Sequence, residues 1–326
     1  MRLLVTGGAG FIGSNFVHHV LKEHPYYEIT VLDNLTYAGR KENLQDLWGK
    51  ISFVKGDITR KEDVEQTAKN CYCIINFAAE THVDRSIIDA GTFVLTDVLG
   101  TYNLLEAARK YKVAKFIQIS TDEVYGDILK GSFTESDRLN PRNPYSASKA
   151  GAELLCHSYF ETYGLFVVVT RSSNNYGPNQ HPEKLIPKSI ILALLNQKIP
   201  IYGTGKNIRD WLYVEDNCAA IGCILRNGEA GEVYNVAGNE KLENLEVVKA
   251  ILKLSGKPEN LIEFVRDRPG HDLRYSINAK KLSALGWKPR TKFKIGLHKT
   301  FQWYMQNAAW WKPVIEKEQI NFHDLQ

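Results

Sequence analysis

The stretch Leu3-Leu4-Val5-Thr6-Gly7-Gly8-Ala9-Gly10-Phe11-Ile12-Gly13 decides the fold of this 326-residue chain. An apolar run that suits a buried strand leads directly into a match to G-x-G-x-x-G, and a helical pattern follows. The glycines permit a tight turn and let backbone N–H groups approach a pyrophosphate, while the helix N-terminus favours the anion. The stretch therefore predicts a dinucleotide site at the first strand–helix junction, involving Gly7, Gly10, Phe11, Ile12 and Gly13.

An acidic residue supports this interpretation. Asp33 ends the second predicted strand, 20 residues after Gly13. A carboxylate at this place can accept hydrogen bonds from the adenosine ribose and would repel a 2′-phosphate, which favours NAD over NADP. A purely structural glycine turn is the alternative, and the strand, helix and acid together make it the weaker one. Asp57, after the third strand, could bond the adenine amine or cap the next segment, and the sequence leaves both open.

The first half of the chain alternates apolar runs with amphipathic segments. Such alternation is typical of βαβ units and predicts a Rossmann-type, doubly wound parallel sheet in the α/β class, with helices on both faces. We expect strands over 2–6, 29–33, 51–57, 73–79, 115–121 and 166–172, and helices over 13–23, 61–70, 93–111 and 144–163.

The second half has a different texture. Pro, Gly, Asn and Asp become frequent over 174–216, and the alternation becomes irregular. We expect residues 1–173 to form the dinucleotide domain and 174–326 to form mainly a smaller substrate lobe, with segments such as 232–238 returning to the main sheet. For Trp310-Trp311 we expect packing of a terminal helix.

Composition narrows the class of protein. Apolar residues make up 44% and charged residues 24%, and the net charge is +4. These values suit a soluble protein with an anionic small-molecule ligand, and they do not suggest a nucleic-acid partner. No apolar run reaches the roughly 18 residues of a membrane helix, and no signal peptide is evident, so we expect a cytoplasmic location. The five cysteines are expected to be reduced core thiols, without a disulfide or metal site.

Tyr145 and Lys149 form a second informative pair. They lie four residues apart in the predicted helix, so they share one face, and Asn143 suits its N-cap. A phenol has a pKa of about 10, which a nearby ammonium, helped by the positive charge of the nicotinamide, would lower. Tyr145 could then take a proton from a sugar hydroxyl as hydride leaves the same carbon, with Thr121 holding that oxygen. The Tyr-x-x-x-Lys pattern alone is a weak indication of redox chemistry, but the predicted dinucleotide site earlier in the chain strengthens this interpretation.

Asp122 and Glu123 directly follow Thr121, in the expected active-site crevice. Oxidation of a sugar C4 hydroxyl acidifies the hydrogen on C5, which a carboxylate can remove, and a protonated acid near C6 lets water leave. Hydride return to C6 and a proton to C5 complete an internal redox elimination. For Asp122 to be the acid, burial or its charged neighbour must raise its pKa. A loop cap or surface ion pair is the alternative, disfavoured by the position of the pair.

Further motifs extend over nearly the whole chain: Leu35-Thr36-Tyr37-Ala38-Gly39, 78–86, 120–126, 174–178, 182–187, 209–216 and 267–272. With these motifs the chain resembles the dTDP-glucose 4,6-dehydratases, a group within the extended short-chain dehydrogenase/reductase family. The resemblance implies that Thr121 binds the C4 oxygen, that Asp122 is the acid at C6 and that Glu123 is the base at C5. Tyr145 would be the redox base and Lys149 its partner.

The resemblance also implies two sets of ligand contacts. NAD, tightly bound and recycled within each turnover, would contact Phe11, Ile12, Asp33, Asn34, Leu35, Thr36, Asp57, Ile58, Phe77, Ala78, Ala79, Thr96, Tyr145, Lys149 and Asn175. The nucleotide sugar, dTDP-glucose, would contact Thr81, Thr121, Asn174, Lys184, Leu185, Pro200, Ile201, Tyr202, Arg209, Asn244, Asp267, Arg268, Pro269, Gly270 and His271.

The implied reaction is that of a hydro-lyase, giving dTDP-4-keto-6-deoxyglucose for deoxysugar biosynthesis, for example of rhamnose. The resemblance further implies a homodimer through helices 93–111 and 144–163. The alternatives are another nucleotide-sugar dehydratase, a 4-epimerase or a decarboxylase on the same scaffold, and a non-catalytic NAD-sensing module. Sequence order alone does not decide which of Asp122 and Glu123 is the acid.

Overall fold

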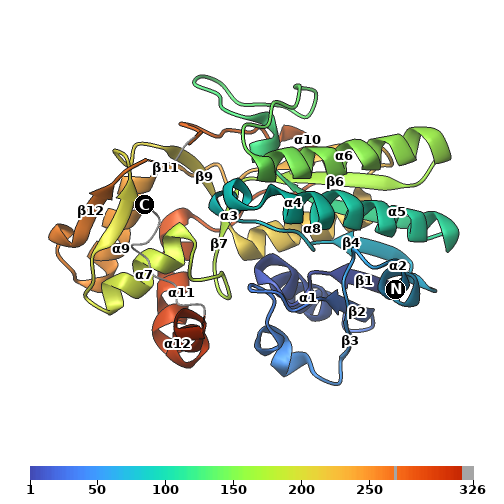
Figure 1. The fold of residues 1–326 in the computed structure, drawn as a ribbon, viewed down its shortest axis with the longest axis horizontal. Coiled ribbons are helices and arrows are strands. Elements are labelled where there is room, and N and C mark those ends of the chain that lie inside the picture. Colours follow the sequence, from blue (N-terminus) through green and yellow to red (C-terminus); the bar gives the residue numbers. More distant parts are fainter. Residues whose placement is uncertain (268–269, 318–326) are drawn as a thin grey trace.

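The computed structural model describes residues 1–267 and 270–317. A large sheet with helices on both faces lies beside a smaller group of strands and helices, as Figure 1 shows. The large sheet has seven parallel strands in the order β10-β6-β5-β4-β1-β2-β3. Their bounds are Arg2–Thr6 (β1), Glu28–Asp33 (β2), Ile51–Lys55 (β3), Cys73–Asn76 (β4), Lys115–Thr121 (β5), Val167–Ser172 (β6) and Val233–Val236 (β10). The predicted Rossmann-type parallel sheet is confirmed, and so is the return of the segment around 232–238, because β10 pairs with β6.

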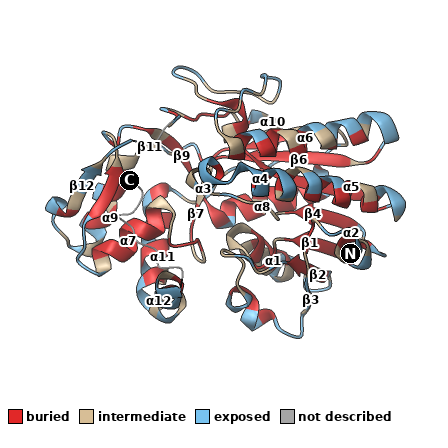
Figure 2. Ribbon diagram, in the orientation of Figure 1, coloured by how far each residue is buried: buried red, intermediate tan, exposed pale blue. Residues whose placement is uncertain are grey.

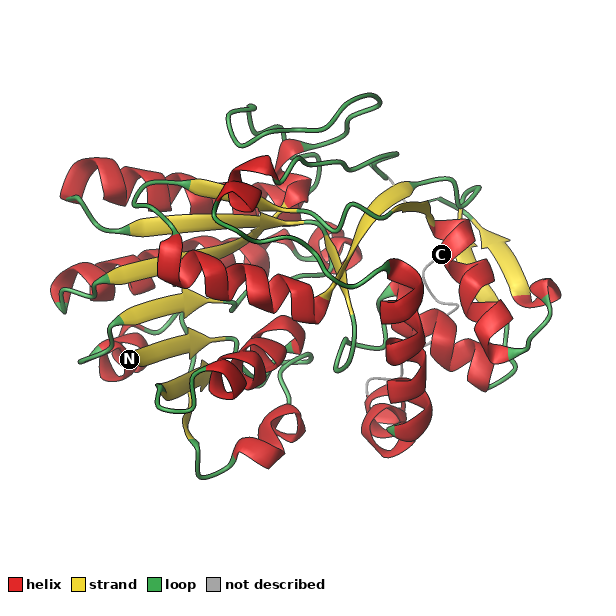
Figure 3. Ribbon diagram, turned by 180° about the vertical axis from the view of Figure 1, so that it is seen from behind, coloured by secondary structure: helices red, strands yellow, loops and turns green. Residues whose placement is uncertain are grey.

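The two faces of the sheet are covered by different helices. One layer contains α1 (Phe11–Glu23) and α8 (Val214–Asn227), and the other contains α2 (Lys61–Ala68), α5 (Gly100–Lys110) and α6 (Pro144–Tyr163). The alternation of side chains along β1 supplies both layers: Leu3 and Val5 join the core with α1 and α8, whereas Leu4 joins the core with α2, α5 and α6. The inner strands are accordingly buried between the layers, whereas the edge strand β3 is partly exposed (Figure 2). Figure 3 shows the same layers from the opposite side.

One predicted helix is divided in the structure. In place of a continuous helix over 93–111, the chain forms α4 (Ala90–Phe93), a π-helical segment η2 (Val94–Leu99) and α5. The wide turn places Asp97 inside the protein, where it accepts hydrogen bonds from the Glu80 N–H at 3.0 Å and the Ser148 hydroxyl at 2.6 Å. A periodicity of 3.6 residues does not reveal such a turn, and π turns are frequent at functional sites.

The smaller group of elements has its own apolar core. It is made of two short sheets and several helices: β7 (Asn174–Tyr176), β9 (Ile208–Tyr213) and β11 (Lys241–Glu243) in one sheet, β8 (Ile199–Tyr202) and β12 (Ile262–Val265) in the other, with α7 (Leu185–Leu194), α9 (Asn244–Ser255), α11 (Phe293–Gln306) and α12 (Ala308–Lys317). Trp311 of α12 is only 3% exposed, which confirms the expected packing role of the C-terminal tryptophans. The remaining short helices are η1 (Lys41–Leu47), α3 (Val83–Ile88), η3 (Asp122–Tyr125), η4 (Glu259–Leu261) and α10 (Lys280–Ala284).

The cysteines follow the prediction: all five are unpaired thiols, and four of them are buried. Within residues 1–267 and 270–317, no helix combines the length and apolarity that crossing a membrane would require.

Candidate active site

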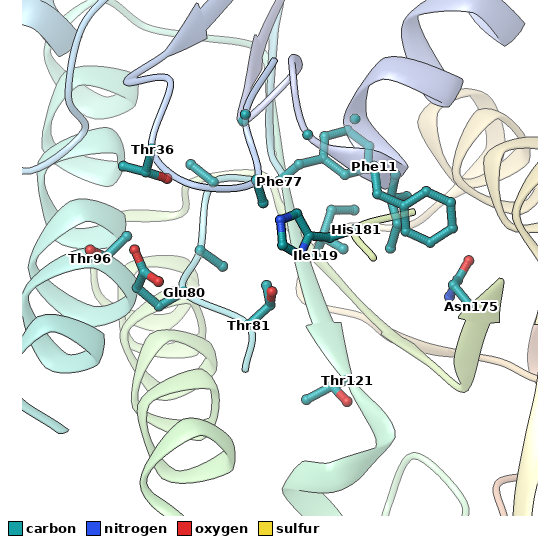
Figure 4. A pocket seen from close by; sticks show the side chains of 18 of the residues that line it. Phe11, Thr36, Phe77, Glu80, Thr81, Thr96, Ile119, Thr121, Asn175 and His181 are labelled. Atoms are coloured by element: carbon teal, nitrogen blue, oxygen red, sulfur yellow. The ribbon is translucent and has the colours of Figure 1, made fainter. Parts of the chain in front are cut away.

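A cavity of about 320 Å³ opens at the carboxyl ends of the parallel strands. Its wall begins at the glycine-rich turn after β1, continues through residues that follow β2, β4 and β5, and ends with the segment 172–184. In Figure 4, Phe11 and Phe77 lie near His181, while Thr121 and Asn175 project from different strands. Open parallel sheets bind their ligands at this edge. Strands β3 and β4 end earlier than predicted, and the residues beyond them line this cavity.

The glycine-rich turn leaves no room for side chains. Gly7 has a φ of +64°, and a Cβ on it would lie 2.5 Å from the Ala78 nitrogen. A Cβ on Gly13 would lie 2.3 Å from the Gly7 carbonyl oxygen. Glycine is therefore required at both places, and the bare backbone at the start of α1 can approach an anion closely. This geometry fits the pyrophosphate of a dinucleotide.

Asp33 is held in a fixed orientation beside that turn. One carboxylate oxygen accepts the Ala9 N–H at 2.9 Å and the other accepts the Leu35 N–H at 2.8 Å. Burial raises the pKa of Asp33, and the two backbone hydrogen bonds oppose this rise by stabilising the charge. The carboxylate lines the cavity at the end of β2, where ribose hydroxyls of a dinucleotide would fit.

Asp57 has the capping role that the sequence offered, and its contact with the adenine amine stays a prediction. Its Oδ1 accepts the Thr59 N–H at 2.8 Å, which caps the turn before α2. Its Oδ2 accepts a hydrogen bond from Asn34 Nδ2 at 2.8 Å, and both residues line the cavity. The turn therefore fixes a carboxylate at the cavity wall.

The other predicted dinucleotide residues are brought together almost completely. The cavity is lined by Gly7, Gly10, Phe11, Ile12, Gly13, Asp33, Asn34, Thr36, Asp57, Ile58, Phe77, Ala78, Ala79, Thr96, Tyr145, Lys149 and Asn175. Leu35 is not part of the lining, and its N–H instead orients Asp33.

The five predicted catalytic residues also line this cavity. Thr121 is the last residue of β5, and η3 carries Asp122 and Glu123 directly beyond it. The Thr121 hydroxyl accepts the Glu123 N–H at 3.2 Å, which fixes the first turn of η3. Tyr145 and Lys149 come from the first turns of α6, and Lys149 Nζ donates to the Ile119 carbonyl at 2.7 Å.

The N-terminus of α6 is capped as the sequence predicts. Asn143 Oδ1 accepts the Ser146 N–H at 2.9 Å, and the Ser146 hydroxyl completes a reciprocal capping box. Pro144 occupies the first helical position. This cap fixes the start of the helix, and with it the face that carries Tyr145 and Lys149.

Asp122 has the electrostatic character of a protonated acid. Its side chain is 3% exposed, and its Oδ2 has no hydrogen-bond partner among the described residues. Burial raises the pKa of Asp122 well above its usual value, and the charges of Glu123 and Asp210 raise it further. Arg209 and the Thr121 hydroxyl act in the opposite direction. The aspartic acid form is thus favoured at this position.

Tyr145 and Lys149 are also buried. Burial raises the pKa of Tyr145 well above 10, and the charges of Glu123 and Asp97 add to the rise, whereas the hydrogen bond with Thr121 opposes it. Burial lowers the pKa of Lys149, and Asp97 is the leading group that favours its charged form. Burial thus opposes a phenolate at Tyr145, and its stabilisation by Lys149 together with the positive nicotinamide stays a prediction.

Several cavity residues were not predicted: Glu80, Ser120, Ser172, Ser173, Gln180, His181 and Glu183. Burial and the charge of Asp97 raise the pKa of Glu80 to about 7, and burial raises the pKa of Asp97 to about 6. Glu80 and Glu183 lie inside sequence motifs that were recognised, so a residue-by-residue reading of those motifs could have found them. For Asp97 the sequence gives no such signal, because only the π turn brings it inward.

The predicted sugar-nucleotide residues divide into two groups. Thr81, Thr121, Asn174 and Lys184 line the cavity, and Lys184 Nζ donates to the Thr81 carbonyl at 2.9 Å. The others lie outside this lining: Leu185, Pro200, Ile201, Tyr202, Arg209, Asn244, Asp267, Gly270 and His271. Arg268 and Pro269 lie outside the described residues.

Arg209 and His271 have protein partners in the structure. Arg209 is 5% exposed, donates to the Asp272 carbonyl at 2.9 Å and lies over the Tyr275 ring at 4.2 Å. His271 Nδ1 lies 2.6 Å from an Asp267 oxygen. Tyr275 also reaches Glu123, with its hydroxyl 3.4 Å from Glu123 Oε2. Tyr275 thus contacts both Arg209 and Glu123, one of the two carboxylates predicted to be catalytic.

Comparisons with known proteins agree with this geometry. Residues 4–300 match the family model described as GDP-mannose 4,6 dehydratase. The low-salt glycan biosynthesis protein Agl12 of Haloferax volcanii is 52% identical over 94% of this chain and 99% of its own length. A dTDP-glucose 4,6-dehydratase of Streptomyces niveus is 47% identical over 96% of each chain.

A solved structure is similar as well. The DesIV dTDP-glucose 4,6-dehydratase of Streptomyces venezuelae, with NAD and TYD bound, superposes with a TM-score of 0.94 at 45% identity. The similarity covers 96% of this chain and 100% of that one. With its parallel sheet, its glycine turn and its Thr121-Asp122-Glu123 cavity, the chain belongs to the GDP-mannose 4,6 dehydratase family.

Proposed function

We propose that this chain is an NAD-dependent dTDP-glucose 4,6-dehydratase, a hydro-lyase that produces dTDP-4-keto-6-deoxyglucose for deoxysugar biosynthesis such as that of rhamnose. The observation that carries the proposal is a single cavity that holds the dinucleotide turn, the pair Tyr145 and Lys149, and the carboxylates of Asp122 and Glu123. The relatives named dTDP-glucose 4,6-dehydratase support it at 43–47% identity over nearly full length.

The redox half of the reaction is assigned to Tyr145, Lys149 and Thr121. Tyr145 takes the proton of the C4 hydroxyl, and Thr121, which already bonds Tyr145, holds the same oxygen. Bound NAD supplies the acceptor and later the donor of hydride, and its positive ring favours the phenolate. The charge of Asp97 opposes the phenolate and also favours the charged form of Lys149.

The elimination half is assigned to the carboxylate pair. Glu123, held by its N–H on Thr121, takes the proton from C5. Asp122, whose pKa is raised by burial, gives its proton to the C6 hydroxyl, which leaves as water. The difference in burial supports Asp122 as the acid, a choice that sequence order left open: Asp122 is buried, and Glu123 is only partly buried.

For the sugar nucleotide we propose the contacts that the resemblance implies, centred on Thr81, Asn174 and Lys184 in the cavity. Lys184 provides a positive charge for the diphosphate. We also propose that residues 1–173 mainly bind NAD and 174–326 mainly bind the sugar nucleotide. The separate apolar core of the smaller group, built from residues between 176 and 311, supports this division.

We propose further that the protein is a homodimer. The elements from α3 to α5 and the neighbouring α6 expose a band of apolar side chains: Ile87, Ile88, Val94, Leu95, Leu99, Tyr102 and Leu154. A second copy of the chain that packs these helices together would cover them. A cytoplasmic location is proposed on the five unpaired thiols, which suit a reducing compartment.

Product analysis tests the function. The purified protein would be incubated separately with dTDP-glucose, UDP-glucose, CDP-glucose and GDP-mannose, and the mass of each product recorded. We expect the loss of one water from dTDP-glucose without net consumption of NADH. An isomer of unchanged mass or release of CO₂ would indicate the epimerase or decarboxylase alternatives.

Glu123→Gln tests the assignment of the base. The amide cannot accept the C5 proton, so we expect dehydration to fall by at least ~10²-fold while C4 oxidation persists. Reduced cofactor absorbing near the nicotinamide band should then accumulate upon mixing with substrate. Tyr145→Phe is the matched comparison, because it should prevent that absorbance from appearing. Full dehydration by Glu123→Gln would refute the assignment.

A further inference from the structure

The adjacent tryptophans of α12 donate to partners in different parts of the molecule. Trp311 Nε1 donates to the Tyr304 carbonyl at 2.8 Å, within the C-terminal helices. Trp310 Nε1 donates to Asn43 Oδ1 at 2.8 Å, in η1 beside the glycine-rich turn. One tryptophan therefore joins α12 to α11, and the other joins α12 to the dinucleotide side of the cavity.

Asn43 is a buried junction with three partners. It is 3% exposed, and its Oδ1 accepts a second hydrogen bond from Asn179 Nδ2 at 3.0 Å. Its Nδ2 donates to the Ala9 carbonyl at 2.8 Å. A single side-chain amide thus joins the glycine-rich turn to α12 and to the segment that follows β7. We name Asn43, Asn179 and Trp310 the Asn43 junction.

The partner in the glycine-rich turn is the peptide that orients the proposed ribose carboxylate. The Ala9 N–H donates to Asp33 Oδ2 at 2.9 Å, and the Ala9 carbonyl accepts from both Asn43 Nδ2 and the Arg40 N–H. The Ala9 residue is fully buried. A shift of Asn43 would therefore move the turn and Asp33 together.

Other contacts run parallel to the junction. Arg40 Nη1 donates to the Trp310 carbonyl at 2.6 Å, and its guanidinium lies 4.9 Å from the centre of the Trp310 ring. Asn15 Nδ2 in α1 donates to the Pro178 carbonyl at 3.1 Å. The glycine-rich turn is thus held from the side of the smaller group of elements, at a distance from the reacting groups.

We propose that the Asn43 junction retains the dinucleotide, and that Trp310 is a positioning residue that keeps the glycine-rich turn closed on it. The proposal rests on the proposed function for the identity of the dinucleotide as NAD. In this proposal NAD leaves by movement of the turn at Gly7–Gly13, which the junction ties to α12. Loss of one junction hydrogen bond should therefore speed release without weakening the chemical steps.

The test uses the protein purified with its bound NAD. The bound NAD is exchanged against an excess of isotope-labelled NAD, and the retained label is followed by filtration over time. Trp310→Phe removes the N–H that Asn43 accepts and keeps an aromatic ring beside Arg40. Trp311→Phe is the matched control, since it removes an equivalent buried N–H that stays within the C-terminal helices. The melting temperature of each protein is recorded in parallel.

We expect Trp310→Phe to exchange NAD about 3- to 10-fold faster than the unmodified chain, in line with the loss of one buried hydrogen bond. Trp311→Phe should lower the melting temperature by a similar amount and leave the exchange rate unchanged. Asn179→Ala, which removes the other donor to Asn43, should also speed exchange. This variant serves as an independent measurement if Trp310→Phe does not fold.

Two results would overturn the proposal: exchange at the unmodified rate in both junction variants, or equally fast exchange in Trp311→Phe. The latter would show that exchange follows general stability. Failure of the proposed function looks different, because product analysis with dTDP-glucose would then show no loss of water, whereas the exchange rates of the variants are measured on the bound NAD alone.

Discussion

At the residue scale, the character of Asp122 comes from its surroundings. The carboxyl follows Thr121 in the chain, and one of its oxygens has no hydrogen-bond partner among the described residues. Its negatively charged neighbours are Glu123 on the same turn and Asp210 on β9. Arg209 is the cation that opposes them, and Tyr145 lies near on α6. Sequence order does not distinguish the two adjacent carboxyl groups, but burial raises the pKa of Asp122 and so supports its proposed role as the acid.

Asp210 is the neighbour that can be changed without touching the reacting groups. It is fully buried, its Oδ1 accepts the Glu240 N–H at 2.8 Å, and its Oδ2 has no partner among the described residues. Its negative charge raises the pKa of Asp122, so Asp210→Asn should lower that pKa. Asp122 would then lose its proton at a lower pH, and the alkaline limb of the kcat profile should move to lower pH.

The measurement is the kcat profile for dehydration between pH 6 and 10, and we expect a shift on the order of 0.5–1 pH unit. C4 oxidation, followed as cofactor absorbance in a single turnover, should stay unchanged. Glu240→Gln is the control, because it removes a charge near Asp210 that does not face Asp122. An alkaline limb at the same pH in both variants would contradict the role of Asp210.

Site residues that belong to local sequence motifs could be predicted from the sequence better than site residues whose position depends on contacts with distant segments. Asp33 and Tyr145 belong to local spacings, and the dinucleotide motif gave those spacings their meaning. Glu80 and Asp97 interact through a π turn, and the inward position of Asp97 depends on how η2 and α6 pack. Asp57 shows an intermediate case, because its local capping role is confirmed, whereas its position in the cavity lining leaves the adenine contact a prediction.

At the element scale, the junction of β1 and α1 has a strict steric requirement. Gly13 faces the Gly7 carbonyl, and this contact holds the helix start against the turn. The whole unit could be predicted because its geometry follows from residues within a dozen positions of each other. The division of the predicted helix 93–111 at Val94–Leu99 could not be predicted in this way, because Asp97 there bonds Ser148 of another element, α6.

Gly13→Ala tests the junction. The added Cβ would lie 2.3 Å from a backbone oxygen that cannot move alone, so the turn must widen. We expect NAD binding to weaken by at least ~10-fold and the free energy of unfolding to fall by about 1–3 kcal/mol. Calorimetric titration with NAD and denaturant unfolding measure the two effects.

Gly222→Ala in α8 is the control for this substitution. The nearest atom to its new Cβ would be His19 Nε2 at 3.4 Å, an ordinary contact at the end of a side chain. Alanine is also the better helix former, so we expect stability to be kept or slightly raised. Unchanged NAD affinity in Gly13→Ala would contradict the steric argument.

At the scale of the whole molecule, the exposed apolar band from α3 to α6 is the feature that a single chain leaves unexplained. Ile88 is 84% exposed and Leu154 is 61% exposed, on neighbouring elements. In a dimer these side chains would lie at the interface, where a buried charge without a partner is costly. The catalytic cavity is formed within one chain, so the dimer would act by supporting α6.

Leu154→Glu should therefore weaken the dimer. We expect the dissociation constant to rise ~10- to 100-fold, measured by light scattering over a range of protein concentrations. Leu129→Glu is the control, because Leu129 is 71% exposed and lies on the loop before Phe133, away from these helices. A monomeric unmodified chain, or equal effects of the two substitutions, would contradict the proposed interface.

The sequence by itself determined the parallel sheet, the glycine-rich turn, the capped helix α6 and the candidates for the catalytic residues. These features depend on side-chain periodicity and short spacings, which act between residues close in the chain. Only the tertiary structure decided that Asp122 is the buried carboxyl, that Asp97 turns inward and that Trp310 bonds Asn43 across 267 positions. Burial and long-range hydrogen bonds depend on how the elements pack, and no local pattern carries that information.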